Sequence, residues 1–390
     1  MSHWLSRLLE RQQVLVTLGN GGVGKTTLAA ALALQGALRG RRTLVLTIDP
    51  ARRLAGALGL EEFTAERQRV PLEGLVPATA GQPGELWVMM LDAPRTFAAL
   101  VARHASNDEA RERIFGHRLY RHMVDALAGS HDLAALEKLH ELLEEHRYDL
   151  IVLDTPPKEH AFDFLDAPSR LLALVAQSRL HWLLLPMAGF GLQQVGGLRS
   201  LPTRLILRSL SRFTGQGVLQ DLATLTLALL DLSTGFKERA ARVEQLLASQ
   251  GCSFLVVTIP DPFTAADALD QRQKLLDSGL PFAGFLVNRC QRIPSHAPDE
   301  GEDMEQLAEQ LSSQDEVAGL LPLVRLRPML LRLGHGLALL RDIARQERET
   351  IARLRGQGAA SSPLLEIPEL DEEIHSVRQL LRFGGLLVEG

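Results

Sequence analysis

The chain has 390 residues, of which 46% are hydrophobic and 23% charged, so it is long and apolar enough to bury a large core. Its formal net charge of −5 at pH 7 gives no overall positive field that would attract nucleic acid or an acidic membrane surface. Cys252 and Cys290 are too few for a disulfide framework and too far apart for a CxxC metal pair, so we expect a cytoplasmic protein without zinc.

The N-terminal segment MSHWLSRLLERQQ has no continuous apolar run. In the whole chain, no stretch of 18 or more residues is free of charges and turn formers. A membrane-spanning helix needs about 20 apolar residues, and a signal peptide needs a central apolar region of about 7 to 15. The sequence therefore predicts neither of these segments.

Short runs rich in Val, Leu and Ile, bounded by turn residues, predict buried parallel strands. These runs lie at Val14–Leu18, Thr43–Ile48, Leu86–Leu91, Asp149–Asp154, Phe254–Ile259 and Phe282–Val287. Helical patterns separate several of them. The expected fold class is therefore α/β, with a doubly wound and mostly parallel sheet.

The first predicted strand runs into the turn GNGGVGKTT, and an Ala- and Leu-rich helical segment follows. The turn satisfies the phosphate-loop pattern GxxxxGK[ST], and a preceding strand and a following helix are the context that this pattern requires. Backbone N–H groups of such a loop converge on phosphate oxygens at the positive end of the helix. We therefore predict a P-loop NTPase that binds ATP through Gly19, Asn20, Gly21, Gly22, Val23, Gly24, Lys25, Thr26 and Thr27.

Three side chains of this loop have predicted roles. Lys25 is expected to act in catalysis, because its positive charge lies at the β- and γ-phosphates. The hydroxyl of Thr26 is the expected Mg²⁺ ligand, and Thr27 is placed for the α-phosphate. Since the chain contains no second copy of the pattern, we predict a single nucleotide site.

Two aspartates follow predicted strands, at the edge where an open α/β sheet binds its ligand. Asp49 comes after TLVLTI, and Asp154 comes after DLIVL. A phosphoryl-transfer site needs one carboxylate for Mg²⁺ or its waters and another group that orients the attacking water. We assign Asp154 to the metal and Asp49 to the water. Taken alone, either aspartate is equally well explained as a strand-end cap.

Two long segments interrupt the alternation of strands and helices. Residues 93–147 place Leu and Ala at helical spacing among charges, and residues 161–249 are rich in Leu. We predict that they form a helical subdomain inserted into a P-loop ATPase domain of residues 1–350. Residues 351–390 contain the flexible composition GQGAASSP and are predicted to be a C-terminal linker and tail.

The phrases GNGGVGKTT, TIDPARRLAGALGL, DTPPKEHAFDFLDAPSRL, GFKERAARVEQLL and FAGFLVNRC occur in this order along the chain. In this respect the sequence resembles the ArsA-like anion-transporting ATPases, a family that includes the eukaryotic ATPase targeting tail-anchored proteins. The resemblance runs from about Val14 to beyond Arg341. It is especially marked for a bacterial subgroup that lacks the family's signature lysine.

The resemblance implies roles for several further residues. Asp49 would organise the hydrolytic water in the first switch loop, and Asp154 would lie near Mg²⁺ at the start of the second. The segment Thr155–His160 would move with the γ-phosphate. Asn288, in the phrase LVNR, would read adenine by hydrogen bonding, although it is also explained as an ordinary polar residue at a strand end.

The sequence also departs from the family pattern. Many relatives read GKGGVGKT, and their first lysine is thought to reach the phosphates of the neighbouring subunit, whereas this chain has Asn20. Arg52, Arg53 or a related subunit would then have to supply the missing cation. We expect a homodimer in preference to a heterodimer with a related ATPase. The two cysteines form no cluster suited to arsenite, which needs converging thiolates.

Three functional hypotheses remain open at the level of the sequence. In the first, ATP-driven closure of a dimer acts on an apolar helical client bound at the Leu-rich region Ala161–Leu232, although those leucines are also explained as a buried core. In the second, the chain is the soluble motor of an anion pump with a membrane-channel partner. In the third, it is a regulatory ATPase of the MinD/ParA kind.

Overall fold

The computed structural model describes eleven stretches of the chain. They are residues 3–48, 55–56, 58–60, 64–72, 84–104, 131–156, 238–239, 241–292, 310–311, 323–356 and 362–389. The Leu-rich region Ala161–Leu232, where a client site is one hypothesis, lies outside them. So do Asp49, Arg52, Arg53 and most of the predicted second switch.

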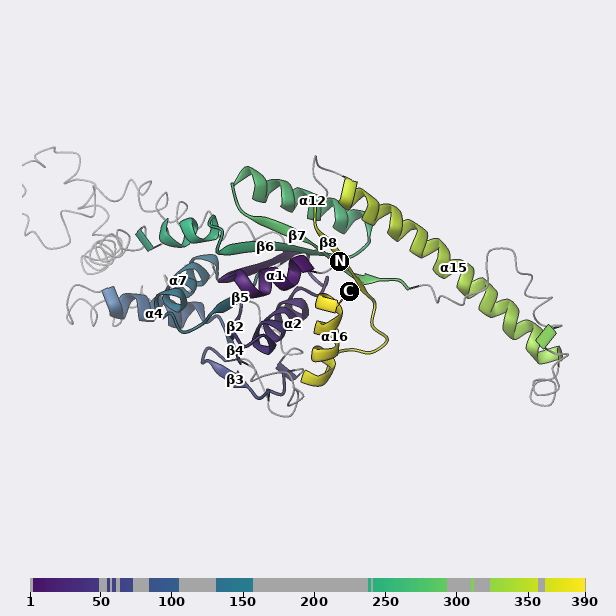
Figure 1. The fold of residues 1–390 in the computed structure, drawn as a ribbon, viewed down its shortest axis with the longest axis horizontal. Coiled ribbons are helices and arrows are strands. Elements are labelled where there is room, and N and C mark those ends of the chain that lie inside the picture. The colour runs from purple at the N-terminus through teal and green to yellow at the C-terminus, as the bar shows by residue number, and fades with distance from the viewer. Residues whose placement is uncertain are drawn as a thin grey trace, which may run out of the picture.

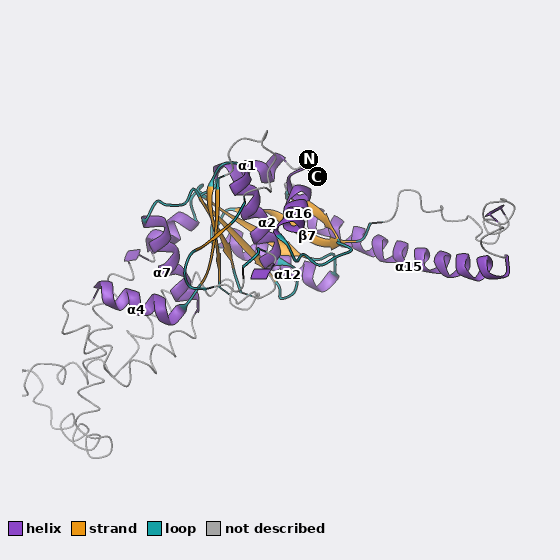
Figure 2. Ribbon diagram, turned by 90° about the horizontal axis from the view of Figure 1, so that it is seen from below, coloured by secondary structure: helices purple, strands orange, loops and turns teal. Residues whose placement is uncertain are grey.

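The described residues form one eight-stranded sheet in the order β3-β4-β2-β5-β1-β6-β7-β8, seen almost edge-on in Figure 2. Every neighbouring pair of strands is parallel except β3 with β4, which is antiparallel. The strands are β1 Val14–Gly19, β2 Arg42–Thr47, β3 Gln68–Val70, β4 Glu85–Met90, β5 Leu150–Asp154, β6 Cys252–Thr258, β7 Phe282–Cys290 and β8 Leu364–Pro368.

Helices cover both faces of the sheet (Figure 1). On one face, α1, α2 and α16 share a buried apolar cluster with Leu15 of β1. On the other face, α7, α12 and the C-terminal part of α15 pack with Val14 and Val16, which point the opposite way from the same strand. The helices are α1 His3–Arg11, α2 Lys25–Leu38, α4 Ala93–His104, α7 His131–Glu144, α12 Pro262–Asp277, α15 Leu323–Gly356 and α16 Val377–Glu389.

This double cover explains why the central strands read as continuous apolar runs. Every residue of β1, β5 and β6 is buried, which is typical of parallel strands with helices on both sides. The register sets Thr17 of β1 and Thr47 of β2 level with Asp154 of β5. The carboxyl ends of these three strands therefore meet at one edge of the sheet.

The predicted α/β fold is confirmed, and each of the six predicted strands is present with ends shifted by at most three residues. The sequence did not predict β3 and β8. β3 has only three residues, and β8 is a five-residue strand at the edge of the sheet. Within the predicted first helical insertion, the structure describes α4 and α7.

The C-terminal segment, for which a linker and tail were predicted, contributes to the same sheet and to one of its covers. β8 pairs with β7, and α16 packs against α2. The two helices lie close together, because a Cβ added at Gly384 would lie 2.8 Å from Nε2 of Gln35. This packing carries residues 368–375 to the carboxyl edge of the sheet.

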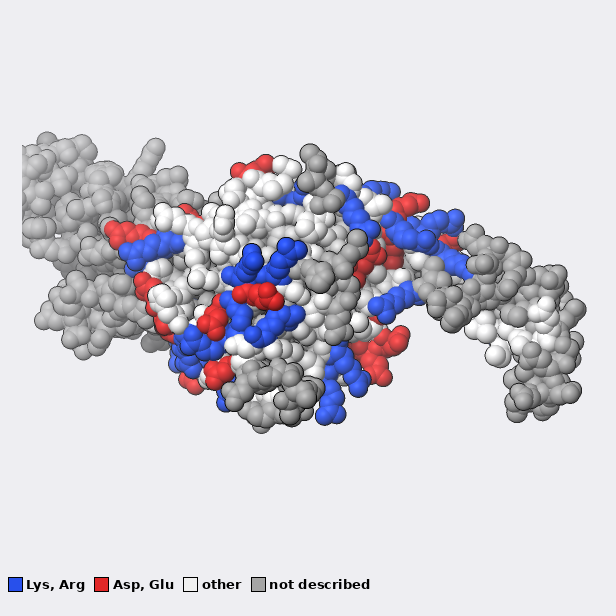
Figure 3. Space-filling view, in the orientation of Figure 1, with Lys and Arg blue, Asp and Glu red and all other residues white. Residues whose placement is uncertain are grey.

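Acidic and basic side chains lie interspersed on the face shown in Figure 3, without one extended basic area. Among the described helices, none is both long and apolar enough to cross a membrane.

Candidate functional site

The phosphate loop connects the end of β1 to the start of α2, in the middle of the sheet. Lys25, the first residue of α2, is 7% exposed, and its Nζ donates a hydrogen bond to the backbone carbonyl of Asn20 at 2.8 Å. The ammonium group therefore folds back over the loop. The start of α2 and the lysine together present positive charge at the position where the sequence predicts phosphate.

Two glycines of the loop allow it to approach neighbouring strands closely. A Cβ on Gly19 would lie 2.2 Å from the carbonyl oxygen of Val257 in β6. Gly24 has a φ of +96°, and a Cβ there would lie 2.4 Å from Nδ2 of Asn288. Real Cβ contacts are not this short, so a side chain at position 19 would have to displace backbone, and one at position 24 would have to displace the loop or the Asn288 side chain.

Gly24→Ala is expected to lower the free energy of unfolding by about 1–3 kcal/mol, because the left-handed backbone and the contact with Asn288 both oppose a Cβ. Gly279→Ala is the matched control: Gly279 has a φ of +69°, but a Cβ there would meet no atom within 4 Å. Thermal denaturation gives the loss of stability in each variant. The loss in Gly279→Ala measures the effect of a positive φ alone, and any further loss in Gly24→Ala measures the effect of the contact with Asn288. Equal losses would mean that Asn288 gives way and does not hold the loop.

Asn288 lies beside the phosphate loop, as the predicted site requires. It is 9% exposed, and its Nδ2 donates to the backbone carbonyl of Val23 at 2.9 Å. The pairing of β7 with β8 shifts between Val287 and Cys290, and Arg289 has a left-handed φ of +59°. An extra residue of this kind bends a strand and redirects its side chains. This hydrogen bond connects Asn288 to the loop. That Asn288 also hydrogen-bonds to adenine stays a prediction.

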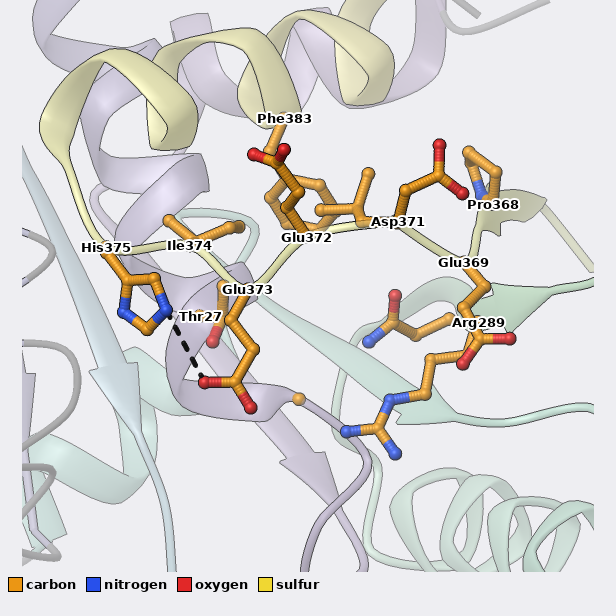
Figure 4. A pocket seen from close by; sticks show the side chains of 13 residues that line it. Thr27, Arg289, Pro368, Glu369, Asp371, Glu372, Glu373, Ile374, His375 and Phe383 are labelled. Atoms are coloured by element: carbon orange, nitrogen blue, oxygen red, sulfur yellow. Dashed lines mark ion pairs between the residues drawn. The ribbon is translucent and has the colours of Figure 1, made fainter.

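A cavity of about 390 Å³ opens next to this contact. Its walls are Gly24 and Thr27 of the phosphate-loop region, Asn288 and Arg289 of β7, and the C-terminal residues Pro368, Glu369, Leu370, Asp371, Glu372, Glu373, Ile374, His375 and Phe383. In Figure 4 the segment from Pro368 to His375 crosses the cavity opposite Thr27 and Arg289. His375 Nε2 lies 3.6 Å from a carboxylate oxygen of Glu373.

Sequence reasoning missed this C-terminal wall. The run PELDEEIH follows the apolar phrase LLEI, so a short strand ending in a polar loop was the available signal. The flexible composition just before it, GQGAASSP, favoured a tail instead.

Asp154 lies at the end of β5, next to β1, and is 1% exposed. Its Oδ2 accepts a hydrogen bond from the hydroxyl of Thr47 at 3.0 Å. The hydroxyl of Thr155 donates to the backbone carbonyl of Thr17 at 2.7 Å, which fixes the next residue against β1. A buried carboxylate at this edge has the oxygen chemistry that Mg²⁺ prefers. Asp154 therefore fits the predicted metal role, and the role of the half-buried Thr26 stays a prediction.

Asp49 itself lies outside the described residues, but the chain that leads to it does not. The N–H of Ile48 donates to the backbone carbonyl of Asp154 at 3.2 Å. Ile48, the last described residue before Asp49, is therefore fixed at the end of β5. The role of Asp49 as the organiser of water stays a prediction.

Asn20 makes a contact that was not anticipated. Its Nδ2 donates to Oδ2 of Asp267, on α12 of the same chain, at 2.7 Å. The sequence offered no reason to connect these positions, which are 247 residues apart.

The two cysteines are unpaired and buried in neighbouring strands. Burial raises the pKa of both thiols, Cys252 and Cys290, to about 12. Both groups are therefore protonated at neutral pH, and neither presents the thiolate that binds a soft metalloid.

Comparison with known proteins places these features in a family. The sequence profile described as "Anion-transporting ATPase" matches residues 12–194. An uncharacterized protein of Streptomyces coelicolor is 30% identical over 311 residues, which cover 79% of this chain and 69% of that protein. A Halobacterium salinarum protein, named as a candidate arsenical pump-driving ATPase, is 32% identical over 41% of this chain but only 24% of its own length.

A further relative is the ATPase get3 of Neurospora crassa, which is 26% identical over 74% of each chain. The match to the first relative extends well beyond the region of the family profile, and the phosphate loop lies inside that profile. The chain belongs to the anion-transporting ATPase family.

Proposed function

We propose that the chain is a Mg²⁺-dependent ATPase that cleaves the β–γ phosphoanhydride bond of ATP. The observation that carries this proposal is the pairing of β1 with β5. β1 leads into the glycine-rich loop that holds Lys25, and β5 ends at the buried carboxylate of Asp154, so both strands end at the same edge of the sheet. A site with these parts accelerates phosphoryl transfer by positioning and by charge.

Each group of residues has a separate proposed role in hydrolysis. The N–H groups of the loop bind and orient the phosphates, and the Lys25 ammonium faces the β- and γ-oxygens, where negative charge spreads in the transition state. Thr26 and Asp154 would hold Mg²⁺, which neutralises phosphate charge when bound. Asp49 orients a water molecule for attack in line with the leaving oxygen. The bond from this water to phosphorus forms as the bond to the leaving ADP oxygen breaks.

The cavity beside Asn288 is proposed as the site of the base and ribose. Its volume of about 390 Å³ is within the usual range of small-molecule sites, about 300–1,000 Å³. Asn288 would present its carboxamide to the adenine edge, and the C-terminal segment would cover the base. A carboxamide offers both a donor and an acceptor, which suits adenine.

Hydrolysis by the purified chain tests the proposal directly. We expect phosphate release from ATP in the presence of Mg²⁺, loss of release when EDTA removes the metal, and recovery when Mg²⁺ is added back. Asn288→Ala is expected to weaken MgATP binding about tenfold or more, because it removes a contact to the base and one to Val23. Binding of ATP without hydrolysis by the wild-type chain when Mg²⁺ is present would contradict the assignment as an ATPase.

ATP turnover is proposed to serve a partner. In the leading hypothesis, a homodimer closes around ATP and the inserted helices grip or release an apolar helical client. The similarity to the ATPase get3 of Neurospora crassa, which covers 74% of each chain, supports the ATPase activity in this hypothesis. The client is this proposal's own addition.

The second hypothesis, the motor of an anion pump, is supported by the name of the Halobacterium relative, although the match covers a small part of that protein. If the chain drives a pump, arsenite bound by its own cysteines is a poor candidate for the cargo. Both thiols are buried and have pKa values raised to about 12. A different anion, recognised by a partner, fits this hypothesis better.

A further inference from the structure

The side chain of Asn20 is held by its own subunit. Its Nδ2 lies 2.7 Å from Oδ2 of Asp267, and its Oδ1 is buried and has no hydrogen-bond partner among the described residues. A hydrogen bond to a carboxylate is stronger than one between neutral groups. The amide is therefore fixed in one orientation and is not directed outward from the loop.

The same residue receives the phosphate-binding lysine. The backbone carbonyl of Asn20 accepts the hydrogen bond from Lys25 Nζ at 2.8 Å. Asn20 thus connects two charged groups: its side chain contacts the carboxylate of Asp267, and its backbone contacts the ammonium of Lys25. Displacement of Asn20 would change where the lysine lies.

Asp267 is carried by a helix with a well-defined start. The Asp261 side chain accepts hydrogen bonds from the N–H groups of Phe263 and Thr264 at 3.1 and 3.0 Å, and Pro262 occupies the first turn. Such a cap stabilises the helix end. The hydroxyl of Thr264 also lies 3.2 Å from the carbonyl of Ile259, which joins α12 to the end of β6.

The face of α12 that carries Asp267 contains a second unusual group. Gln271, one turn further along, is 1% exposed, and neither its Oε1 nor its Nε2 has a hydrogen-bond partner among the described residues. A buried polar atom without a partner destabilises the fold. Among the described residues, Gln271 of α12 is therefore buried with unsatisfied polar atoms, whereas Asp267 on the same helix has a hydrogen-bond partner in Asn20.

We propose that Asp267 is a positioning residue that anchors the phosphate loop to α12, and through Asn20 sets the place of Lys25. The proposal rests on the assignment of this loop to ATP. It gives position 20 a role within its own subunit, and it makes α12 the element through which the start of the loop is held. Asp267 does not touch the reacting atoms.

Three variants test the anchor. Asp267→Ala removes the acceptor, and Asp267→Asn keeps an acceptor oxygen without the charge. Asp270→Ala is the matched control, because Asp270 lies on the same helix, half-exposed, and pairs with Lys274 at 2.9 Å. Amide hydrogen exchange is followed by mass spectrometry for peptides covering residues 19–28, in the full chain without nucleotide.

We expect Asp267→Ala to speed exchange across the loop about tenfold and to lower kcat by a similar factor, with a smaller change in KM. In Asp267→Asn, the exchange rate of the loop and kcat should both lie close to the wild-type values. Asp270→Ala should change neither the exchange rate nor kcat. Exchange in Asp267→Ala equal to that in Asp270→Ala would overturn the anchor.

A double-mutant cycle distinguishes a specific coupling between Asn20 and Asp267 from a general destabilisation of the fold. If Asn20 and Asp267 act through each other, Asn20→Ala/Asp267→Ala exchanges no faster than Asp267→Ala alone, whereas independent effects would add. Additive effects would count against the proposal. A wild-type chain that fails to hydrolyse ATP would remove the proposed function, but the exchange measurements would still decide whether the anchor exists.

Discussion

Lys25→Ala is expected to lower the rate of ATP hydrolysis by about 10³-fold or more, the scale on which a cation at the transferring phosphoryl group acts. The lysine is 7% exposed and is fixed by the carbonyl of Asn20, so its charge is already in place before the transition state forms. The backbone N–H groups of the loop remain in the variant. Nucleotide binding should therefore weaken much less than hydrolysis.

Phosphate release and fluorescent-nucleotide binding, measured on the same preparation, separate these two effects. Lys274→Ala is the control, because Lys274 is half-exposed and pairs with Asp270 on α12. It should hydrolyse ATP at the wild-type rate. Near wild-type turnover by a folded Lys25→Ala protein would mean that this loop is not the catalytic phosphate site.

The sheet was predictable from the sequence because its central strands are covered on both faces. Burial on two sides demands apolar residues at successive positions, and these runs stand out from the surrounding helices. β1, β5 and β6 are entirely buried and were all predicted. The edge strands obey weaker constraints: β3 is the phrase QRV, with only Val70 buried, and gives no comparable signal.

The conformation of the glycine-rich turn was predictable because a local pattern specifies it. The order of strand, glycine-rich turn and helix predicted the turn and the position of Lys25 at the start of the helix. This was possible because the conformation of such a turn depends on residues that are adjacent in the sequence. Asn288 was expected near nucleotide through a family resemblance, and its contact with Val23 places it at the loop. The resemblance did not reveal the bulge around Arg289 that accompanies this contact.

Contacts between distant segments had no local signal. The C-terminal wall of the cavity depends on α16 packing against α2, and the amide of Asn20 depends on a carboxylate 247 residues away. The sequence showed only that Asn20 replaces a lysine, and this led to the expectation of a cation missing across a dimer. The structure adds that the side chain at this position contacts the carboxylate of Asp267 in its own subunit.

Asp49→Asn is expected to slow ATP hydrolysis about 10²- to 10⁴-fold while MgATP binding stays within about threefold of wild type, because the amide keeps the shape and removes the carboxylate that acts on the water. Ile48, the residue before Asp49, is held to the backbone of Asp154, the predicted metal ligand, by a hydrogen bond of 3.2 Å. Single-turnover hydrolysis and equilibrium binding measure the two quantities separately.

Asp92 provides the matched control for Asp49, since it follows β4, the neighbour of β2 in the sheet. Its Oδ1 accepts a hydrogen bond from the N–H of Arg95 at 2.9 Å, which makes it a helix cap. Asp92→Asn should keep full hydrolysis, because an asparagine caps a helix about as well as an aspartate. If Asp49→Asn loses nucleotide binding together with hydrolysis, the carboxylate supports the binding site itself, and the attacking water must be oriented by another group.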